Sequence, residues 1–182
     1  MEDFTNTVEN DLKLLKSTPS KLEKVLAGEN FETISKRPLT NKWSALEIVC
    51  HLRDVEELFQ IRFLTILALD KPQIFVLSAS ADELKPWKVG EEMRHPLDPD
   101  SWAEERQYAR NDVYEALTAF AKRRNEVMNL LESLTTQEWQ RVGVHLHKGE
   151  MSLARWVSGL AAHDVKHLAQ LSNALEGHYE NL

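Results

Sequence analysis

The stretch from Leu153 to Glu176 constrains the fold of this chain more than any other. Read as a helix, it places apolar residues at spacings of three, four and seven: Leu153, Trp156, Leu160, Leu168, Leu171 and Leu175. Residues at these spacings share one helical face, which predicts an amphipathic helix with one side in a core. His163 and His167 lie beside that apolar stripe. Two histidines four residues apart on a helix can direct ring nitrogens at one transition-metal ion, and such an ion needs a third ligand.

A second long helix, predicted from Ser44 to about Leu69, supplies a candidate for that third ligand. Its first residues, Ser44-Ala45-Leu46-Glu47, match a capping box, in which serine and glutamate satisfy backbone N–H groups. His51 lies beside the apolar stripe of this helix, away from the face that is predicted to be charged (Arg53, Glu56 and Glu57). A single buried histidine is best explained by a hydrogen bond to a neighbour. Three together are better explained by one shared metal ion, which relieves the cost of burying all of them.

The whole chain, 1–182, is predicted to be a single domain, an all-α four-helix bundle. The predicted helices cover approximately 4–27, 44–69, 101–134 and 152–177. The first is expected to break near Thr18, because Thr18-Pro19 is typical of a helix cap followed by proline in the first turn. Glu29 to Lys42 is interpreted as an irregular connection, and 141–151 as a short hairpin-like loop.

The second and third long helices are joined by an unusually long connection, from Asp70 to Asp100. At roughly 30 residues, an extended segment is long enough to run back along a neighbouring helix. The two helices that it joins are therefore predicted to be parallel neighbours. Long connections of this kind often act as lids, so the segment is expected to cross one end of the bundle and partly cover the metal pocket.

Composition excludes several functional classes. The chain has 22 lysines and arginines against 29 aspartates and glutamates, and its net charge of −7 argues against a nucleic-acid partner. No apolar run is long enough to span a bilayer, so no membrane association is expected. The single cysteine, Cys50, and an N-terminus without an apolar signal segment predict a cytoplasmic protein. The expected partner is a small-molecule substrate.

Two motifs of this chain resemble the DinB-like superfamily, including its YfiT-type members. The segment from Trp43 to Leu52, W-S-A-L-E-I-V-C-H-L, is similar to the family's Trp-Ser-x-x-Glu-Ile-x-x-His-Leu signature. The segment from His163 to Leu171, H-D-V-K-H-L-A-Q-L, is similar to its closing His-x-x-x-His motif with a trailing Gln-Leu. The family often has glutamate or tyrosine around this last pair, where this chain has Asp164 and Lys166.

The resemblance implies an up-down-down-up bundle, often a homodimer, with a three-histidine site for zinc or nickel. Its ligands in this chain are His51, His163 and His167. Three neutral imidazoles leave a divalent ion with open positions, where water is acidified or a carbonyl or thiol is polarised. The chain is therefore expected to be a metal-dependent hydrolase or a thiol S-transferase, since some relatives use a low-molecular-weight thiol cofactor. The alternative is a non-catalytic metal-binding or stress-response interaction protein, whose site would be closed by a fourth protein ligand.

Side chains near the three histidines are candidates for supporting roles. Asp54 is expected either to orient the His51 imidazole or to belong to a solvated face, and Asp164 and Gln170 are further candidates for holding a ligand in place. Glu47 is expected to cap its helix. Trp156 is predicted to wall the metal pocket.

The remaining histidines and the cysteine are expected to lie outside the site. His145 and His147 share one face of a predicted strand and are a second possible metal pair, although solvent exposure is the simpler interpretation. His95 lies in the long connection, where it could line a lid, and His178 is expected to be frayed. Cys50 points about 100° away from His51 on a helix, so it is predicted to be a core residue.

Overall fold

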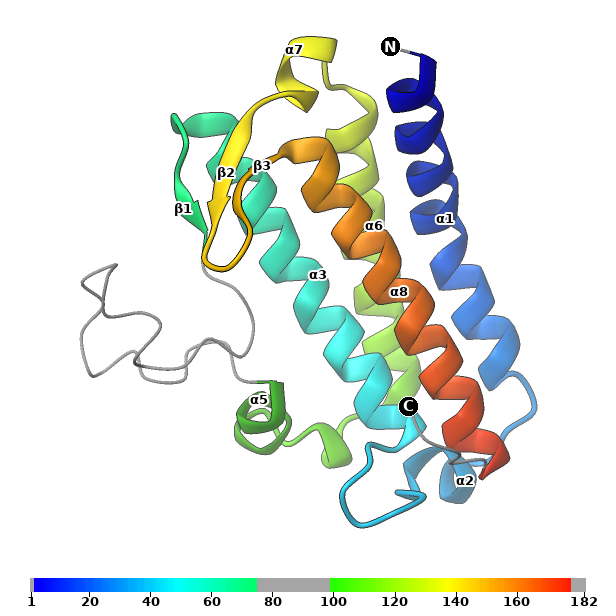
Figure 1. Ribbon diagram of the computed structural model, residues 1–182. Helices are drawn as coiled ribbons and strands as arrows, with labels where there is room; N and C mark the ends of the chain where they lie inside the picture. Colours follow the sequence, from blue (N-terminus) through cyan, green and yellow to red (C-terminus); the bar gives the residue numbers. More distant parts are fainter. Residues whose placement is uncertain (1, 75–98, 178–182) are drawn as a thin grey trace.

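The computed structural model describes residues 2–74 and 99–177, in which four long helices dominate (Figure 1). They are α1 (Glu2–Leu26), α3 (Ala45–Ala68), α6 (Val113–Glu132) and α8 (Leu153–Glu176). The prediction of an all-α four-helix bundle is confirmed. The shorter helical segments are α2 (Phe31–Ser35), α5 (Pro99–Glu105), η3 (Tyr108–Arg110) and α7 (Thr136–Trp139).

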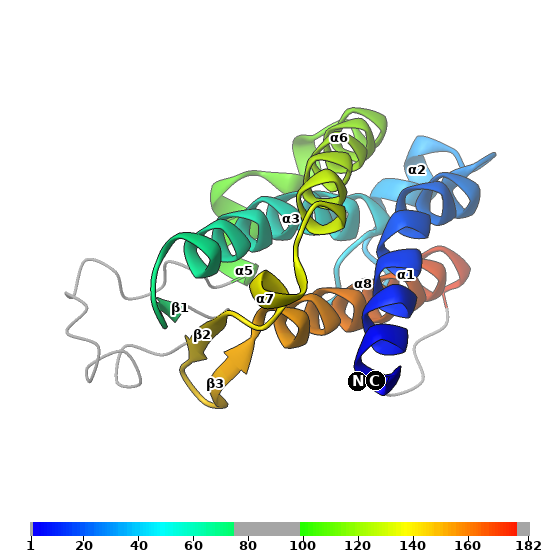
Figure 2. The same ribbon diagram turned by 90° about the horizontal axis from the view of Figure 1, so that it is seen from above.

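The long helices follow an up-down-down-up order. In Figure 1, α1 and α8 run in one direction and α3 and α6 in the other. The view along the bundle in Figure 2 shows a four-cornered arrangement, in which α3 packs against both α6 and α8, and α1 closes the other side. The prediction that α3 and α6 are parallel neighbours is therefore correct. None of the helices within residues 2–74 and 99–177 has the length and apolar character needed to cross a membrane.

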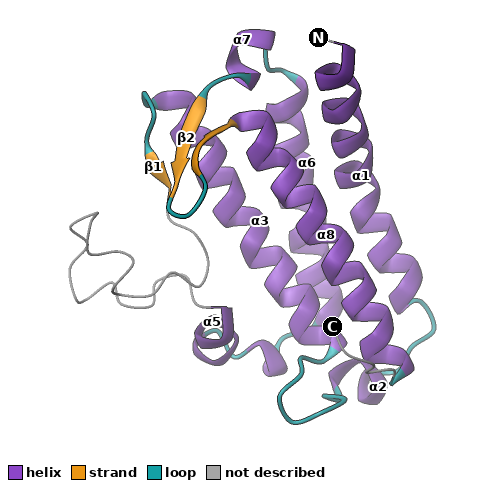
Figure 3. Ribbon diagram, in the orientation of Figure 1, coloured by secondary structure: helices purple, strands orange, loops and turns teal. Residues whose placement is uncertain are grey.

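A small sheet lies at one end of α3 and α8 (Figure 3). The predicted hairpin is present as β2 (Val142–His145) and β3 (Gly149–Ser152), which pair antiparallel. A strand that was not predicted, β1 (Gln73–Ile74), pairs parallel with β2 and ties the start of the long connection to the hairpin. Gly143 is needed here, since a Cβ atom on it would lie 2.8 Å from a side-chain carbon of Ile66.

Most of the long connection, 75–98, lies outside the described residues. Its predicted crossing over the end of the bundle and its cover of the metal pocket therefore stay predictions. The same holds for the expected positions of His95 and His178.

The predicted break of the first helix near Thr18 is wrong, because α1 continues through Pro19. Proline has no N–H, so the carbonyl of Leu15, one turn earlier, loses its usual helical donor. The Nη1 atom of Arg124 on α6 donates to this carbonyl instead, at 2.8 Å. A side chain from a neighbouring helix thus replaces the missing hydrogen bond, and the helix passes the proline without ending.

The predicted helix over 101–134 is also wrong, since the structure divides it into α5, η3 and α6. The chain turns at Gln107, whose φ of 50° lies in the left-handed region. It restarts at Asp112, whose side chain accepts hydrogen bonds from the backbone N–H groups of Tyr114 and Glu115 at 2.8 and 2.9 Å. The segment 29–42, expected to be irregular, contains the short helix α2, capped by the side chain of Asn30.

Two apolar clusters fill the interior, one toward each end of the bundle. The first lies toward the hairpin and includes Phe63, Val127 and Leu160. The second lies toward α2 and includes Cys50, Leu46, Tyr108, Phe120 and Leu171. Cys50 is fully buried, as predicted. Between the two clusters lies a layer of buried polar side chains: His51, Glu56, Arg124, Asp164 and His167.

Candidate metal centre

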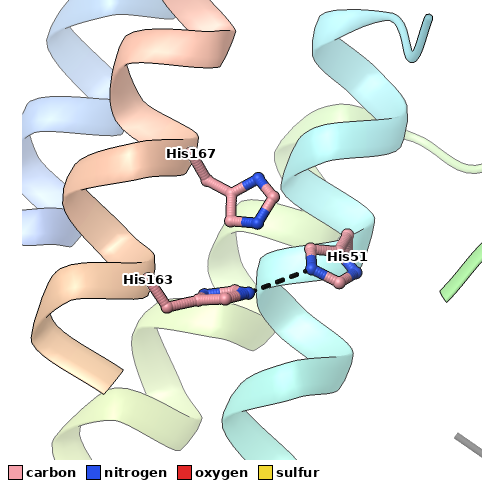
Figure 4. Close-up of side chains that lie close together, drawn as sticks. All are labelled: His51, His163 and His167. Atoms are coloured by element: carbon pink, nitrogen blue, oxygen red, sulfur yellow. Dashed lines mark hydrogen bonds between the residues drawn. The ribbon is translucent and has the colours of Figure 1, made fainter. Parts of the chain in front are cut away.

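Three histidines converge between α3 and α8, in the middle of the bundle (Figure 4). His51 comes from α3, and His163 and His167 come from adjacent turns of α8. One ring nitrogen of each can be chosen so that all lie within 4.8 Å of one another. His51 and His167 are buried, with exposed fractions of 2% and 8%, and His163 is half-buried. The structure thus brings together all three of the predicted ligands.

The spacing of these nitrogens fits a shared ion. The Nε2 atoms of His51 and His163 are 3.1 Å apart. Two imidazole nitrogens that bind one zinc ion at about 2.0–2.1 Å, at roughly tetrahedral or octahedral angles, lie about 3 Å apart. The Nδ1 atoms of the same two rings are buried and have no hydrogen-bond partner in the described part of the chain. These two histidines are therefore not explained as structural residues held by a neighbouring carboxylate or carbonyl.

The third ring, that of His167, is held in the orientation that metal binding requires. Its Nδ1 atom lies 2.8 Å from Oε1 of Gln170, one turn later on α8. Because an amide oxygen only accepts, Nδ1 carries the ring proton and Nε2 keeps its lone pair for the centre. Gln170 therefore takes the supporting position that its spacing suggested, and it does so by fixing the tautomer of a ligand.

Burial keeps these imidazoles neutral. Removal from water, together with the neighbouring His167, lowers the pKa of His51 to about 3. Burial likewise lowers the pKa of His167 to about 4 and holds that of His163 well below its ordinary value. Only a neutral imidazole has a lone pair for a metal, so all three residues are in the binding form at neutral pH.

An aromatic ring, that of Trp43, lies beside the histidines, and the predicted place of Trp156 in the pocket wall stays a prediction. The centroid of the Trp43 ring lies 4.8 Å from that of His51. Trp156 is buried two turns away from His163 on α8, where it packs against the ring of His145 at 5.3 Å. Its distance from the centre follows from the helical rise of about 1.5 Å per residue, which separates positions 156 and 163 by about 10 Å. Trp43 precedes the capping serine and carried no periodic signal.

Asp54 serves neither of the roles predicted for it. Its carboxylate is buried and accepts hydrogen bonds from Nε of Arg53 at 2.7 Å and from the hydroxyl of Tyr108 at 2.8 Å. Arg106 forms an ion pair with the same carboxylate at 2.8 Å. Although burial alone would raise it, these donors hold the pKa of Asp54 below its usual value. Asp54 therefore anchors η3 to α3, and no hydrogen bond joins it to His51 in the described structure.

Asp164 and Glu56 also differ from expectation, because both pair with a fully buried arginine. Asp164 lies next to His163 in the sequence, but its carboxylate faces Arg124 on α6, with oxygen–nitrogen distances of 2.7 and 3.2 Å. Glu56 was predicted to lie on a charged outer face. It is instead fully buried, at 2.6 and 2.7 Å from the same guanidinium group. Glu47, by contrast, caps α3 as predicted, and it also pairs with Arg37.

The other histidine pair does not form a comparable centre. His145 is half-buried, and its Nδ1 atom accepts from the backbone N–H groups of His147 and Lys148 at 3.1 and 3.3 Å. His147 is exposed, as the simpler interpretation predicted. Within residues 2–74 and 99–177, His51, His163 and His167 are the one group of three or more potential ligands close enough to share an ion.

The fold and this histidine cluster define a class of protein that comparison with known families identifies. A family model of the DinB superfamily matches residues 14–171, so the chain belongs to that superfamily. Among solved structures it is similar to YfiT from Bacillus subtilis, described as a probable metal-dependent hydrolase with an unusual four-helix bundle topology. The TM-score is 0.75 at 19% sequence identity, over 92% of this chain and 85% of that one. No curated protein sequence matches.

Proposed function

We propose that this protein is a metal-dependent hydrolase that binds one zinc or nickel ion through His51, His163 and His167. The observation that carries the proposal is the convergence of three neutral imidazoles from two helices, with no fourth protein ligand among the described residues. A catalytic site of this kind needs three protein ligands and an open position, whereas a structural site is closed. The description of YfiT as a probable metal-dependent hydrolase supports the same reading.

The side chains around the centre have separate roles in this proposal. A divalent ion, when bound, would lower the pKa of a bound water toward neutrality and polarise a carbonyl group. The three histidines are neutral and would leave the charge of the ion uncompensated. Gln170 keeps the lone pair of His167 directed at the centre. The Trp43 ring lies against the His51 ring, with centroids 4.8 Å apart, and would help to hold that ligand in place.

Thiol transfer is the second candidate, and the positions of the carboxylates favour it. Hydrolysis at a metal is often assisted by a nearby acid or base, yet Asp54 and Asp164 are both engaged by arginines. A thiol has a pKa much closer to neutrality than free water, so on binding a divalent ion it could release its proton to solvent without a neighbouring carboxylate. A low-molecular-weight thiol is thus a cofactor that this centre suits. A non-catalytic metal-binding or stress-response role is the third possibility that the experiment must separate.

The proposal is tested by metal analysis of the purified protein, followed by a substrate screen. We expect one zinc or nickel ion per chain, removed by a chelator and restored by adding the metal back. The metal-loaded protein is then given esters, amides and pairs of a thiol with an electrophile. Turnover of esters or amides without thiol supports the hydrolase, and turnover only with thiol supports the transferase. Bound metal without turnover of any of them would indicate the non-catalytic role.

A further inference from the structure

Arg124, in the middle of α6, uses every hydrogen-bond donor that a guanidinium group has. Nε and Nη2 donate to the two carboxylate oxygens of Glu56 at 2.7 and 2.6 Å. Nη1 and Nη2 donate to the two oxygens of Asp164 at 2.7 and 3.2 Å. The second hydrogen of Nη1 goes to the Leu15 carbonyl at 2.8 Å. An arginine has five N–H donors in a fixed planar fork, and here all five are matched.

These contacts join all four long helices at the level of the histidines. Glu56 lies on α3, five residues after His51, and Asp164 lies on α8 between the two ligands of that helix. Leu15 belongs to α1 and Arg124 to α6. The guanidinium and both carboxylates are fully buried, with side-chain exposures of 1% or less. One side chain therefore sets the position of the helix that carries two ligands relative to the helix that carries the third.

We propose that Arg124 is a positioning residue for the metal centre, acting through Asp164 and Glu56. The inference rests on the proposed metal binding at His51, His163 and His167. Ligands on two separate helices form a competent site only if the helices are held to within a fraction of an ångström. The two bidentate pairs of Arg124 fix both distance and rotation, because each couples a planar fork to a planar carboxylate. A point charge such as lysine would hold the distance without the rotation.

The test compares metal binding in the folded state across four conservative variants. Arg124→Lys keeps the positive charge but loses the planar guanidinium group. A change in metal affinity in this variant therefore reports the geometry of the contacts and not the charge. Asp164→Asn releases α8, which carries two ligands, and Glu56→Gln releases α3 beside one ligand. Arg123→Lys is the matched control, since this neighbouring arginine is partly exposed and contacts Glu57, the backbone of Arg53 and, at 3.6 Å, Asp54, none of which pairs with Arg124. Each variant is first shown to be folded by circular dichroism and chemical denaturation.

The readouts are the zinc dissociation constant, from competition with a chelator, and the visible absorption of the cobalt-substituted protein. Loss of a group that orients metal ligands typically weakens binding 10–100-fold. We expect losses of at least tenfold and an altered cobalt spectrum for Arg124→Lys and Asp164→Asn. Glu56→Gln should lose less, and Arg123→Lys should match the unaltered protein. If Arg124→Lys fails to fold, the metal affinity and cobalt spectrum of Asp164→Asn decide whether the positioning role is correct.

Two results would overturn the positioning role of Arg124, and they differ in whether the proposed metal-binding function still stands. Folded Arg124→Lys or Asp164→Asn protein with unchanged zinc affinity and an unchanged cobalt spectrum would show that Arg124 serves only the fold. The proposed function would then stand. If the unaltered protein itself binds none of zinc, nickel and cobalt, the metal centre is wrong, and the positioning role falls with it.

Discussion

Two buried polar clusters lie side by side in the middle of this bundle, and they differ in how completely their hydrogen bonds are made. Around Arg124, all five guanidinium donors meet acceptors on three other helices. In the histidine cluster, the buried Nδ1 atoms of His51 and His163 have no partner in the described structure. Buried polar groups are nearly always hydrogen-bonded, so an incomplete set needs a separate explanation.

Within one buried polar layer, the Arg124 cluster therefore serves the fold, whereas the histidine cluster is the candidate for ligand binding. Asp164 and His163 are adjacent in the sequence, yet Asp164 belongs to a saturated network, whereas His163 directs Nε2 at Nε2 of His51 and leaves its Nδ1 atom without a partner in the described structure. In the Arg124 cluster, the hydrogen bonds and ion pairs offset the free-energy cost of removing three charged groups from water. In the histidine cluster, the Nε2 atoms of His51 and His163 face each other at 3.1 Å, and we propose that a metal ion binds among the three rings. Removing residues from the first cluster should therefore reduce stability, and removing them from the second should reduce binding.

The largest expected effect is on metal content. Replacing His51 by alanine removes one of three ligands, so we expect metal occupancy at pH 7 to fall from one ion per chain to nearly none. The protein should remain folded, because the cavity lies in a polar layer between two apolar clusters. Elemental analysis after gel filtration measures the occupancy. His145→Ala is the control and should keep full occupancy. Retention of the metal by His51→Ala would mean that the three-histidine site is misassigned.

The next effect is on stability and concerns the saturated cluster. Replacing Arg124 by methionine leaves two buried carboxylates without a counter-charge, which typically costs about 3–5 kcal/mol. Lys16→Met removes an exposed ion pair with Glu132 and should cost less than about 1 kcal/mol. Urea denaturation of the metal-free proteins measures both free energies of unfolding. Equal losses for the two variants would contradict the distinction between the saturated cluster and an ordinary surface pair.

A third effect is the pH dependence of the metal-free protein. Burial lowers the pKa of His51 to about 3 and that of His167 to about 4. An unfolded histidine titrates near about 6.5, so below that pH the unfolded chain binds more protons than the folded one. Stability should therefore be complete above about pH 6.5 and fall toward pH 4. The expected loss is about 2 kcal/mol per histidine between about pH 6.5 and 5.

Thermal unfolding at a series of pH values checks this dependence. The comparison with His51→Gln isolates the contribution of one imidazole, because the variant should lose less stability over the same range. A melting temperature that stays constant between about pH 7 and 5 would show that the imidazoles are not held neutral by burial.

The smallest effect concerns the one histidine whose second nitrogen has a partner. Replacing Gln170 by leucine removes the acceptor of the His167 Nδ1 proton at similar volume. Metal affinity should fall by about tenfold, as for other groups that orient a ligand, with little change in the stability of the metal-free protein. Isothermal titration with zinc measures the affinity. Gln140→Leu, at the end of the short helix α7, is the control and should bind as the unaltered protein does.

The features predicted well from the sequence are those with local causes. The capping boxes at Ser44 and Thr135 depend on residues three apart, and both are present. The convergence of His51 with the α8 pair was predicted from helical periodicity together with the resemblance to the DinB-like superfamily. The errors arose where a distant partner decides the outcome. Pro19 should have ended a helix, but Arg124, more than a hundred residues later, supplies the missing donor.

Burial of charged residues was mispredicted for the same reason. Glu56 and Asp54 lie off the main apolar stripe of α3, and periodicity alone assigns such positions to solvent. However, α3 packs against α6, α8 and η3, so its buried surface extends around most of the helix. The acidic residues there are buried because Arg124, Arg53 and Arg106 neutralise them. Two of these arginines, Arg106 and Arg124, lie outside α3, so no pattern within that helix reveals them.

The separation of the ligands along the chain has a consequence for biosynthesis. His51 and His163 are 112 positions apart, and the second of them lies on the last long helix. During translation, domains form from the N-terminal side as the chain emerges. A nascent chain therefore exposes one ligand long before the other two, and one imidazole holds a divalent ion only weakly. In the proposed metal-bound protein, loading would have to wait until α8 has been made and packed, so a bound ion would report that all four long helices are in place.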